Sequence, residues 1–167
     1  FIVNLAIDKR LSWFYIVCAG ILTAYAPAYV CIVSQKNRLE KALAVLSICT
    51  VLVIGVVQMV LYYQMGIGGL WFWDMGLPVT ALWLLIVWIG AASHMLFRVN
   101  LFISIAIIAF LAVPGNVATH LLIGDYRGME DIYANYMLDG MGNIIAAFVF
   151  LFIGIAFQAK KGKKLEK

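Results

Sequence analysis

Charged residues are scarce in this sequence and are confined to short clusters. Lys and Arg number 12 and Asp and Glu number 8 among 167 residues, so 12% of the chain is charged, against about 25% in soluble domains. Between the clusters lie five stretches of about twenty residues without a charge. A single Asp, Lys or Arg at the centre of a transmembrane helix costs about 2.5–3.5 kcal/mol. The scarcity excludes an ordinary soluble domain and predicts a membrane protein.

The motifs of common enzyme and cofactor sites are also missing. The three cysteines, Cys18, Cys31 and Cys49, lie in apolar runs with no CxxC pair and no His at ligand spacing, which predicts buried hydrophobic residues and no metal or redox site. No GxSxG, HExxH or intramembrane Asp pair occurs, and the glycine-rich run at 66–69 lacks the Lys-Ser/Thr end of a P-loop. We therefore expect no enzyme activity, no catalytic residue and no cofactor.

Nucleic-acid binding is disfavoured as well. The net charge of +4 comes from short basic flanks of apolar segments, without a basic face interleaved with aromatic residues. The lipid bilayer is the partner that this composition predicts.

The apolar stretches define one transmembrane domain over residues 1–167. The predicted class is an all-α polytopic bundle with five complete helices, and the apolar segment Phe1–Ile7 is interpreted as the end of a sixth helix. Within the fourth span, Pro114-Gly115-Asn116 is expected to kink or interrupt the helix. The predicted spans are residues 11–34, 42–63, 77–97, 101–123 and 141–159.

The positive residues predict an orientation. When the five spans alternate, the cluster Lys36, Arg38 and Lys41, the turn at Arg98 and the tail Lys160–Lys164 all fall on one side. Positive residues in short loops stay in the cytoplasm, so this side is predicted to be cytoplasmic and to hold the C-terminus. The turn Asp8-Lys9-Arg10 is the one discordant cluster.

A weak internal repeat appears at a shift of 58 positions. Trp13-Phe14 then aligns with Trp71-Phe72, and Asn4, Tyr62 and His120 coincide. Three copies of a helical hairpin would explain the pattern. A common hairpin length imposed by the bilayer thickness would also produce it.

Aromatic and polar residues in the outer half of the spans form the predicted ligand site. The aromatic residues are interpreted either as an interfacial belt or as the lining of an outward-facing vestibule. Thr23 and Tyr25 are further polar residues inside spans. Polar residues within a span must face other helices or a wet cavity. They serve either as interhelical hydrogen-bonding groups or as ligand contacts. The predicted site residues are Gln58, Trp71, Trp73, Asp74, Asn116 and His120.

Small residues at intervals of four predict close helix packing. Gly20, Ala24 and Ala28 lie on one stripe of the first span, and Gly142 and Ala146 begin a similar pattern in the last. Such stripes let a neighbouring backbone approach closely. We expect these surfaces to contact other helices.

Several short motifs resemble a family of small membrane proteins from Gram-positive bacteria. The motifs are Asn4-Leu5, Leu11-Ser12-Trp13, Ile16-Val17, Gly68-Gly69-Leu70-Trp71-Phe72 and Leu77-Pro78. The resemblance implies about six hydrophobic helices behind a cytoplasmic zinc-ribbon head, in a family without an assigned activity. The zinc-ribbon cysteines do not occur in this sequence, and the resemblance implies no catalytic residue.

Two functional hypotheses follow. The first is a non-enzymatic integral membrane domain, in the bacterial cytoplasmic membrane, that senses a small-molecule or lipidic ligand or associates with a protein partner or a second copy. The alternative is a transporter for a small neutral solute, or the substrate-binding subunit of a larger transporter, which hairpin repeats and a broken fourth helix would favour. The lack of an intramembrane charged residue argues against proton- or sodium-coupled transport.

Overall fold

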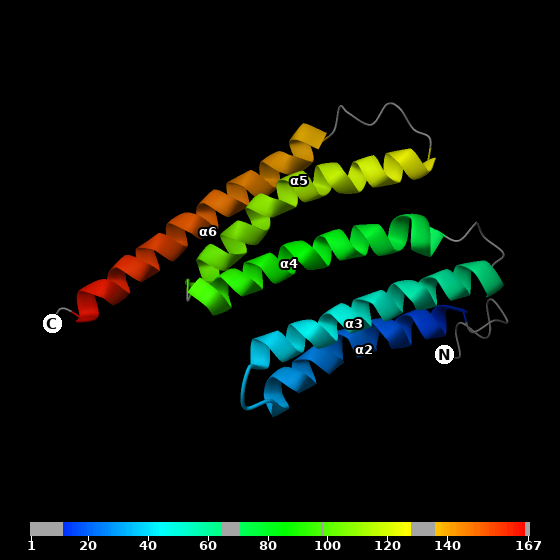
Figure 1. Cartoon of the computed structure of the whole chain (residues 1–167), viewed down its shortest axis with the longest axis horizontal. Helices are drawn as coiled ribbons and strands as arrows, with labels where there is room; N and C mark the ends of the chain where they lie inside the picture. Colours follow the sequence, from blue (N-terminus) through cyan, green and yellow to red (C-terminus); the bar gives the residue numbers. More distant parts are fainter. Residues whose placement is uncertain (1–11, 65–70, 98, 128–135, 166–167) are drawn as a thin grey trace. The chain divides into compact units, whose positions relative to one another are not determined.

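The computed structural model describes residues 12–64, 71–97, 99–127 and 136–165 (Figure 1). All regular elements in these ranges are helices, which confirms the all-α class. They are α2 (Ser12–Val33), α3 (Arg38–Met59), η1 (Val60–Gln64), η2 (Phe72–Gly76), α4 (Leu77–Phe97), α5 (Leu101–Arg127) and α6 (Tyr136–Leu165), where η1 and η2 are short π-helices. The predicted end of a sixth helix, Phe1–Ile7, lies outside the described residues.

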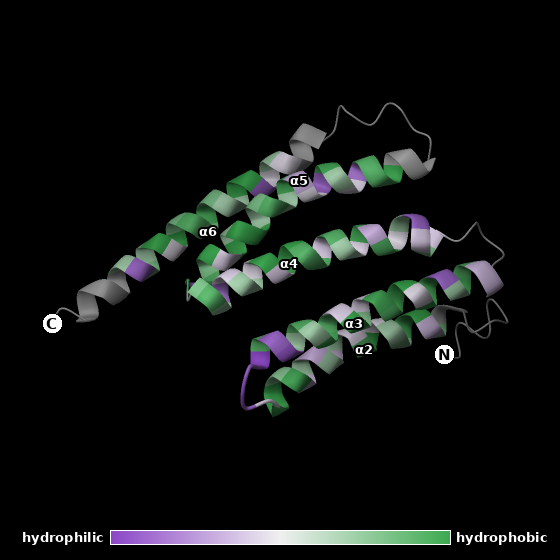
Figure 2. Cartoon of the chain, viewed as in Figure 1, coloured by the Kyte–Doolittle hydropathy of each residue, from purple (hydrophilic) through white to green (hydrophobic). Residues whose placement is uncertain are grey.

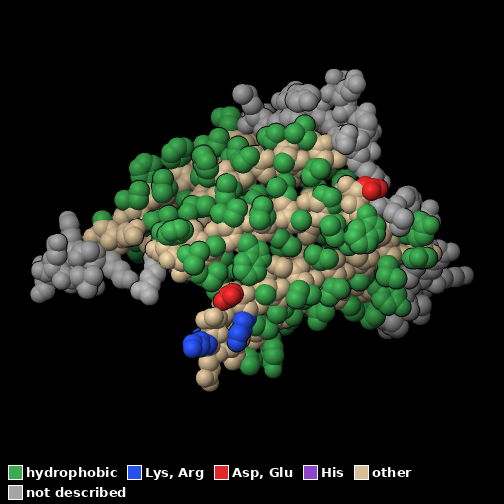
Figure 3. All heavy atoms as spheres, in the orientation of Figure 1, with side chains coloured by type: hydrophobic (Ala, Val, Ile, Leu, Met, Phe, Trp, Pro, Cys, Tyr) green, Lys and Arg blue, Asp and Glu red, His purple; other side chains and the backbone are tan. Residues whose placement is uncertain are grey.

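Among the described residues, five helical segments are long and apolar enough to cross a membrane. Each contains 20 to 26 residues, and about 20 residues span the hydrocarbon core of roughly 30 Å. Hydrophobic side chains cover most of the surface seen in Figure 3, and Figure 2 shows hydrophilic residues concentrated at the α2–α3 turn. The chain is therefore a multi-pass membrane protein. The segments are Phe14–Val33, Arg38–Tyr63, Phe72–Phe97, Leu101–Ile123 and Gly140–Ala159.

Two segments begin earlier than the sequence predicts. The second begins at Arg38 rather than 42, because the chain turns at Asn37, which has a left-handed backbone (φ 55°) that asparagine tolerates better than most residues. The Asn37 side chain donates to Glu40 Oε2 at 3.2 Å, so the charged residues occupy the first helical turn instead of preceding it. The third begins at Phe72 rather than 77, because η2 continues directly into α4.

The chain divides into two compact units, Phe1–Thr80 and Ala81–Lys167. In the first unit α2 and α3 pack as an antiparallel pair (Figure 1), and α3 also contacts η1 and η2. Hydroxyl groups inside these helices are satisfied locally, because Thr23 donates to Ala19 O and Thr50 donates to Leu46 O, each at 2.8 Å. The prediction of one domain over the whole chain stays a prediction.

Within the described part of the first unit, the small-residue stripe on α2 does not make the helix contacts that we expected. Gly20, Ala24 and Ala28 are exposed, and no atom lies within 4 Å of the position that a Cβ would take at Gly20. Tyr25 is 73% exposed, so it faces no other helix within the described part of the first unit. All three cysteines were expected to be buried, but Cys18 and Cys31 are exposed and only Cys49 is buried. The four-residue spacing identifies a stripe of small side chains but does not say which face of α2 meets α3.

In the second unit α4, α5 and α6 form an antiparallel series. Gly90 of α4 lies so close to Ile108 of α5 that an added Cβ would overlap the isoleucine side chain. Gly154 of α6 packs in the same way against Ile103 of α5. Nearby, the rings of Phe102 and Phe157 stack with their centroids 5.3 Å apart. Missing Cβ atoms thus allow both helix pairs to approach closely.

The expected interruption at Pro114 does not occur. The helix α5 is continuous from Leu101 to Arg127 with Pro114 inside it. Figure 1 shows that α5 bends near its middle. Proline removes one backbone hydrogen bond and crowds the preceding turn, which bends a helix without ending it when neighbouring helices support it.

Candidate functional site

Two π-helical segments lie at the same end of α3. The first, η1, follows α3 directly, and the second, η2, contacts α3 after the chain returns. The N–H of Leu77 donates to the carbonyl oxygen of Phe72, five residues back, which closes the π-helical turn of η2. Segments of this kind are rare and often occur at functional sites, so this end of the first unit is the first place to look for one.

Gln58 connects α3 to η2. Its side chain is only 7% exposed, and its Oε1 accepts a hydrogen bond of 3.2 Å from the backbone N–H of Phe72. The first N–H groups of a helix have no partner within the helix, so Gln58 supplies a cap from a neighbouring element. The predicted interhelical role of Gln58 therefore has a defined partner.

Trp71, the residue before Phe72, has an indole N–H that no acceptor in the described structure satisfies. The Nε1 atom is buried. The indole ring packs over Gly76, where an added Cβ would lie 2.6 Å from Trp71 Cζ3. A buried N–H left without an acceptor costs about 1–3 kcal/mol. An acceptor supplied by a ligand, after a small movement of the ring, would recover part of this energy.

Trp73 and Asp74, which follow Trp71 and Phe72 in the chain, are the exposed residues of this site. Trp73 is 66% exposed and its ring meets the ring of Phe72 edge to face, with centroids 5.1 Å apart. Asp74 is exposed in the first turn of η2. Gln58, Trp71, Trp73 and Asp74, hereafter the Trp71 cluster, thus combine an apolar aromatic surface, one buried donor and one carboxylate.

The other two predicted site residues belong to the second unit. Asn116 and His120 are half-buried on α5, and the structure places them on a different unit from the Trp71 cluster. Beside them lies a bond that the sequence analysis missed: Trp83 Nε1 donates to Thr119 Oγ1 at 3.0 Å, and the same hydroxyl donates to Gly115 O at 2.8 Å. The sequence could have indicated this bond through the antiparallel register of the third and fourth spans, which brings Trp83 and Thr119 to the same level.

The other end of the α4–α5 pair is held by a histidine. Nδ1 of His94 lies 2.8 Å from the carbonyl oxygen of Val99, which can only accept, so Nδ1 carries the proton. In the residue before His94, the hydroxyl of Ser93 lies 3.4 Å from the hydroxyl of Ser104 on α5. These contacts fix the α4–α5 turn and indicate a packing role for His94.

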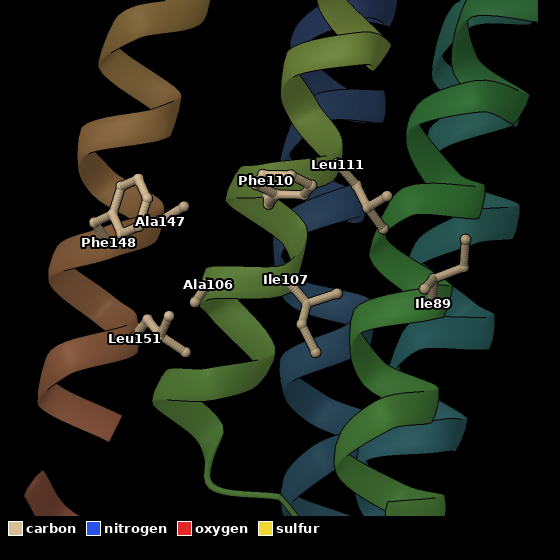
Figure 4. Close-up of a pocket in the computed structure, with 8 residues that line it drawn as sticks. All are labelled: Ile89, Ala106, Ile107, Phe110, Leu111, Ala147, Phe148 and Leu151. Carbon is tan, nitrogen blue, oxygen red and sulfur yellow. The ribbon is translucent and has the colours of Figure 1, made fainter. Parts of the chain in front are cut away.

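A groove in the second unit is wholly apolar. Its volume is about 480 Å³, and its lining residues come from α4, α5 and α6 (Figure 4). Ligand sites usually add a few polar groups that orient the ligand, and none of the described residues that line this groove is polar. Lipid chains are as apolar as its walls, so entry of an apolar ligand from the bilayer gains little. The lining residues are Ile89, Ala106, Ile107, Phe110, Leu111, Ala147, Phe148 and Leu151.

The described residues contain no cluster of three or more His, Cys, Asp or Glu side chains that could hold a metal ion. No protein-family model, curated protein or solved structure matches the chain.

Proposed function

We propose that this chain is a non-enzymatic integral membrane domain that senses a ligand or associates with a partner through the Trp71 cluster. The observation that supports this most strongly is the buried Trp71 Nε1 without an acceptor, set between two π-helical segments. A packed structure that leaves a donor unsatisfied gains stability when a ligand supplies the acceptor.

The cluster also has the mixed character of a small-molecule site. Aromatic surface at Trp73 and Phe72 provides contact area, and a single carboxylate at Asp74 would give specificity for a ligand that is cationic or donates hydrogen bonds. No pair of a nucleophile and a base accompanies them among the described residues of this cluster, which is why the proposal is binding and not catalysis.

We place the chain in a bacterial cytoplasmic membrane with its C-terminus in the cytoplasm. The basic residues Lys36, Arg38 and Lys41 lie at the α2–α3 turn, opposite the end of α3 that carries the cluster. With that turn inside, the Trp71 cluster faces the exterior. A ligand would then reach it without crossing the membrane.

Transport of a small neutral solute is the alternative function. The half-buried Asn116 beside Pro114 supports it, because polar groups within a span often line a substrate path. The sequence had favoured transport partly because the fourth helix was expected to be broken, but α5 is continuous. The sensing and association hypothesis needs no such break.

The proposed function is tested by what copurifies with the protein. The chain is extracted with its surrounding lipid in polymer nanodiscs, and bound molecules are identified by mass spectrometry for the native sequence, Trp71→Phe and Trp83→Phe. We expect a molecule that is retained by the native chain and by Trp83→Phe and is lost from Trp71→Phe, since the Trp71 Nε1 has no acceptor whereas the Trp83 Nε1 already donates to Thr119 Oγ1. Identical molecules on all three proteins would contradict the proposal.

A further inference from the structure

A second groove lies in the first unit, between α2 and the end of α3. Its volume is about 350 Å³. The lining residues are Tyr15 from α2, Val56 and Met59 from α3, and Val60 and Tyr63 from η1. Unlike the apolar groove of the second unit, it has a phenol group on each side.

The groove changes from polar to apolar along the direction of the membrane normal. Tyr15 is the second residue of the span Phe14–Val33, and Tyr63 is the last residue of Arg38–Tyr63, so both phenols lie where the spans end. Val56 lies seven residues before Tyr63, which is about 10 Å deeper at 1.5 Å per residue. A lipid in the same leaflet has the same gradient, with its ester groups at the boundary and its acyl chains below.

The two hydroxyl groups are available to a ligand. Neither Tyr15 nor Tyr63 has a hydrogen bond to any described residue, and their side chains are 48% and 76% exposed. Each ring is positioned by a neighbour, because Phe14 meets Tyr15 and Tyr62 meets Tyr63 in edge-to-face contacts with centroid distances of 6.1 Å and 5.0 Å. Such contacts restrict the rings before a ligand arrives.

The π-helical segment η1 shapes the groove. It supplies two of the lining residues, Val60, which is 3% exposed, and Tyr63. A π-helical turn inserts an extra residue and rotates the following side chains relative to an α-helix. Tyr63 therefore takes a position that a regular continuation of α3 would not give it.

None of the described residues that line the groove is charged. An anion held there would have no cationic partner in apolar surroundings, which is costly, so the neutral phenols fit a neutral acceptor such as an ester carbonyl. We propose that the groove binds one membrane glycerolipid, whose ester carbonyl accepts hydrogen bonds from Tyr15 and Tyr63 and whose acyl chain lies over Val56, Met59 and Val60.

The lipid site is separate from the Trp71 cluster. On α3, Gln58 faces η2 through its bond to Phe72 N–H, and Ile54, one turn earlier, contacts the position of a Gly76 Cβ. At about 100° per residue, Val56 and Val60 lie about 160° around α3 from Gln58 and Met59 about 100° from it, so the groove is on a different face of the helix. The inference goes beyond the proposed function and does not depend on it.

Native mass spectrometry of the delipidated chain in detergent, titrated with dioleoylphosphatidylcholine, tests the proposal. We expect one lipid to bind more tightly than the rest, and the double variant Tyr15→Phe/Tyr63→Phe to bind it about tenfold more weakly, from the loss of two neutral hydrogen bonds. Tyr25→Phe/Tyr29→Phe is the matched control, because both phenols are exposed on α2 and neither lines the groove. Equal affinity of the double variant and the control would overturn the proposal.

Two further measurements test which part of the lipid is bound and whether the groove is the binding site. Dioleoylglycerol, which keeps the esters and lacks the phosphate, is expected to compete for the same site, and failure to compete would overturn the ester assignment. Val56→Trp fills the apolar part of the groove and leaves both phenols in the sequence, so it is expected to remove the tight lipid even if the double variant folds poorly. Dissociation of an oligomer by Val56→Trp with lipid binding unchanged would show that a second copy occupies the groove, and would overturn the lipid site.

Discussion

Gly154 and Gly142 offer a direct test of how α6 packs, because they lie on one helix in opposite surroundings. A Cβ added at Gly154 would lie 2.6 Å from Ile103 Cγ1, 3.1 Å from the Ile103 backbone nitrogen and 3.4 Å from Phe102 Cβ. Near Gly142 no atom lies within 4 Å of that position. The same substitution to alanine therefore adds a methyl group to a close helix contact in one case and to open space in the other.

The magnitudes follow from two opposing effects. Replacing glycine by alanine in a helix gains about 1 kcal/mol of helix propensity at either position. Overpacking at Gly154 opposes this gain by about 1–3 kcal/mol, because the backbone of α5 blocks one side and Ile103 must move. Gly142→Ala is expected to stabilise the protein by up to about 1 kcal/mol, and Gly154→Ala to destabilise it by up to about 2 kcal/mol.

The assay is reversible unfolding by sodium dodecyl sulfate in mixed micelles, followed by circular dichroism, with both variants measured beside the native chain. The free energy of unfolding of Gly142→Ala should exceed that of Gly154→Ala by about 1–3 kcal/mol. Equal stabilisation of both variants would refute the close contact of α5 and α6 at Gly154. Equal loss would mean that the exposed face at Gly142 also packs against protein.

Other substitutions test the polar contacts. Gln58→Leu removes the cap on Phe72 N–H and should lower the free energy of unfolding by about 1–3 kcal/mol, whereas Asn116→Leu, for which no such bond is seen, should change it less. If Gln58→Leu raises stability, the cap is not important. Trp83→Phe and Thr119→Val should show a coupling of about 0.6–1.7 kcal/mol in a double-mutant cycle, and additive effects would refute their hydrogen bond. Tyr25→Phe should leave stability within about 0.5 kcal/mol, because its side chain is exposed, and a larger loss would show that α2 contacts another helix there.

The helices were predictable because a charged residue is tolerated only near the ends of a span. That single constraint located each apolar segment, and it failed by a few residues only where charged side chains fit into a first helical turn, as at Arg38 and Glu40. Local residue preference also located the bend at Pro114. It did not decide whether the helix continues, because support from neighbouring helices is a tertiary property.

The contacts between helices were less predictable. Gln58 was recognised as a polar group that needs a partner, yet the partner is the backbone N–H of Phe72, which no pattern of side chains reveals. The stripe at Gly20, Ala24 and Ala28 has the spacing of a packing surface and is exposed, since spacing gives a face but not its neighbour. Tyr15 and Tyr63 form a groove only after η1 rotates the end of α3, and a sequence does not state that rotation.

The proposed outward position of the Trp71 cluster decides whether a ligand outside the cell can reach it. It is measured most directly by labelling with a membrane-impermeant maleimide in a chain whose three native cysteines are replaced. A cysteine at exposed Asp74 should react in intact cells, and one at exposed Gln35, in the α2–α3 turn, should react only after the membrane is permeabilised. Reaction at Gln35→Cys in intact cells, or protection of Asp74→Cys, would contradict both the orientation and the proposed route of the ligand.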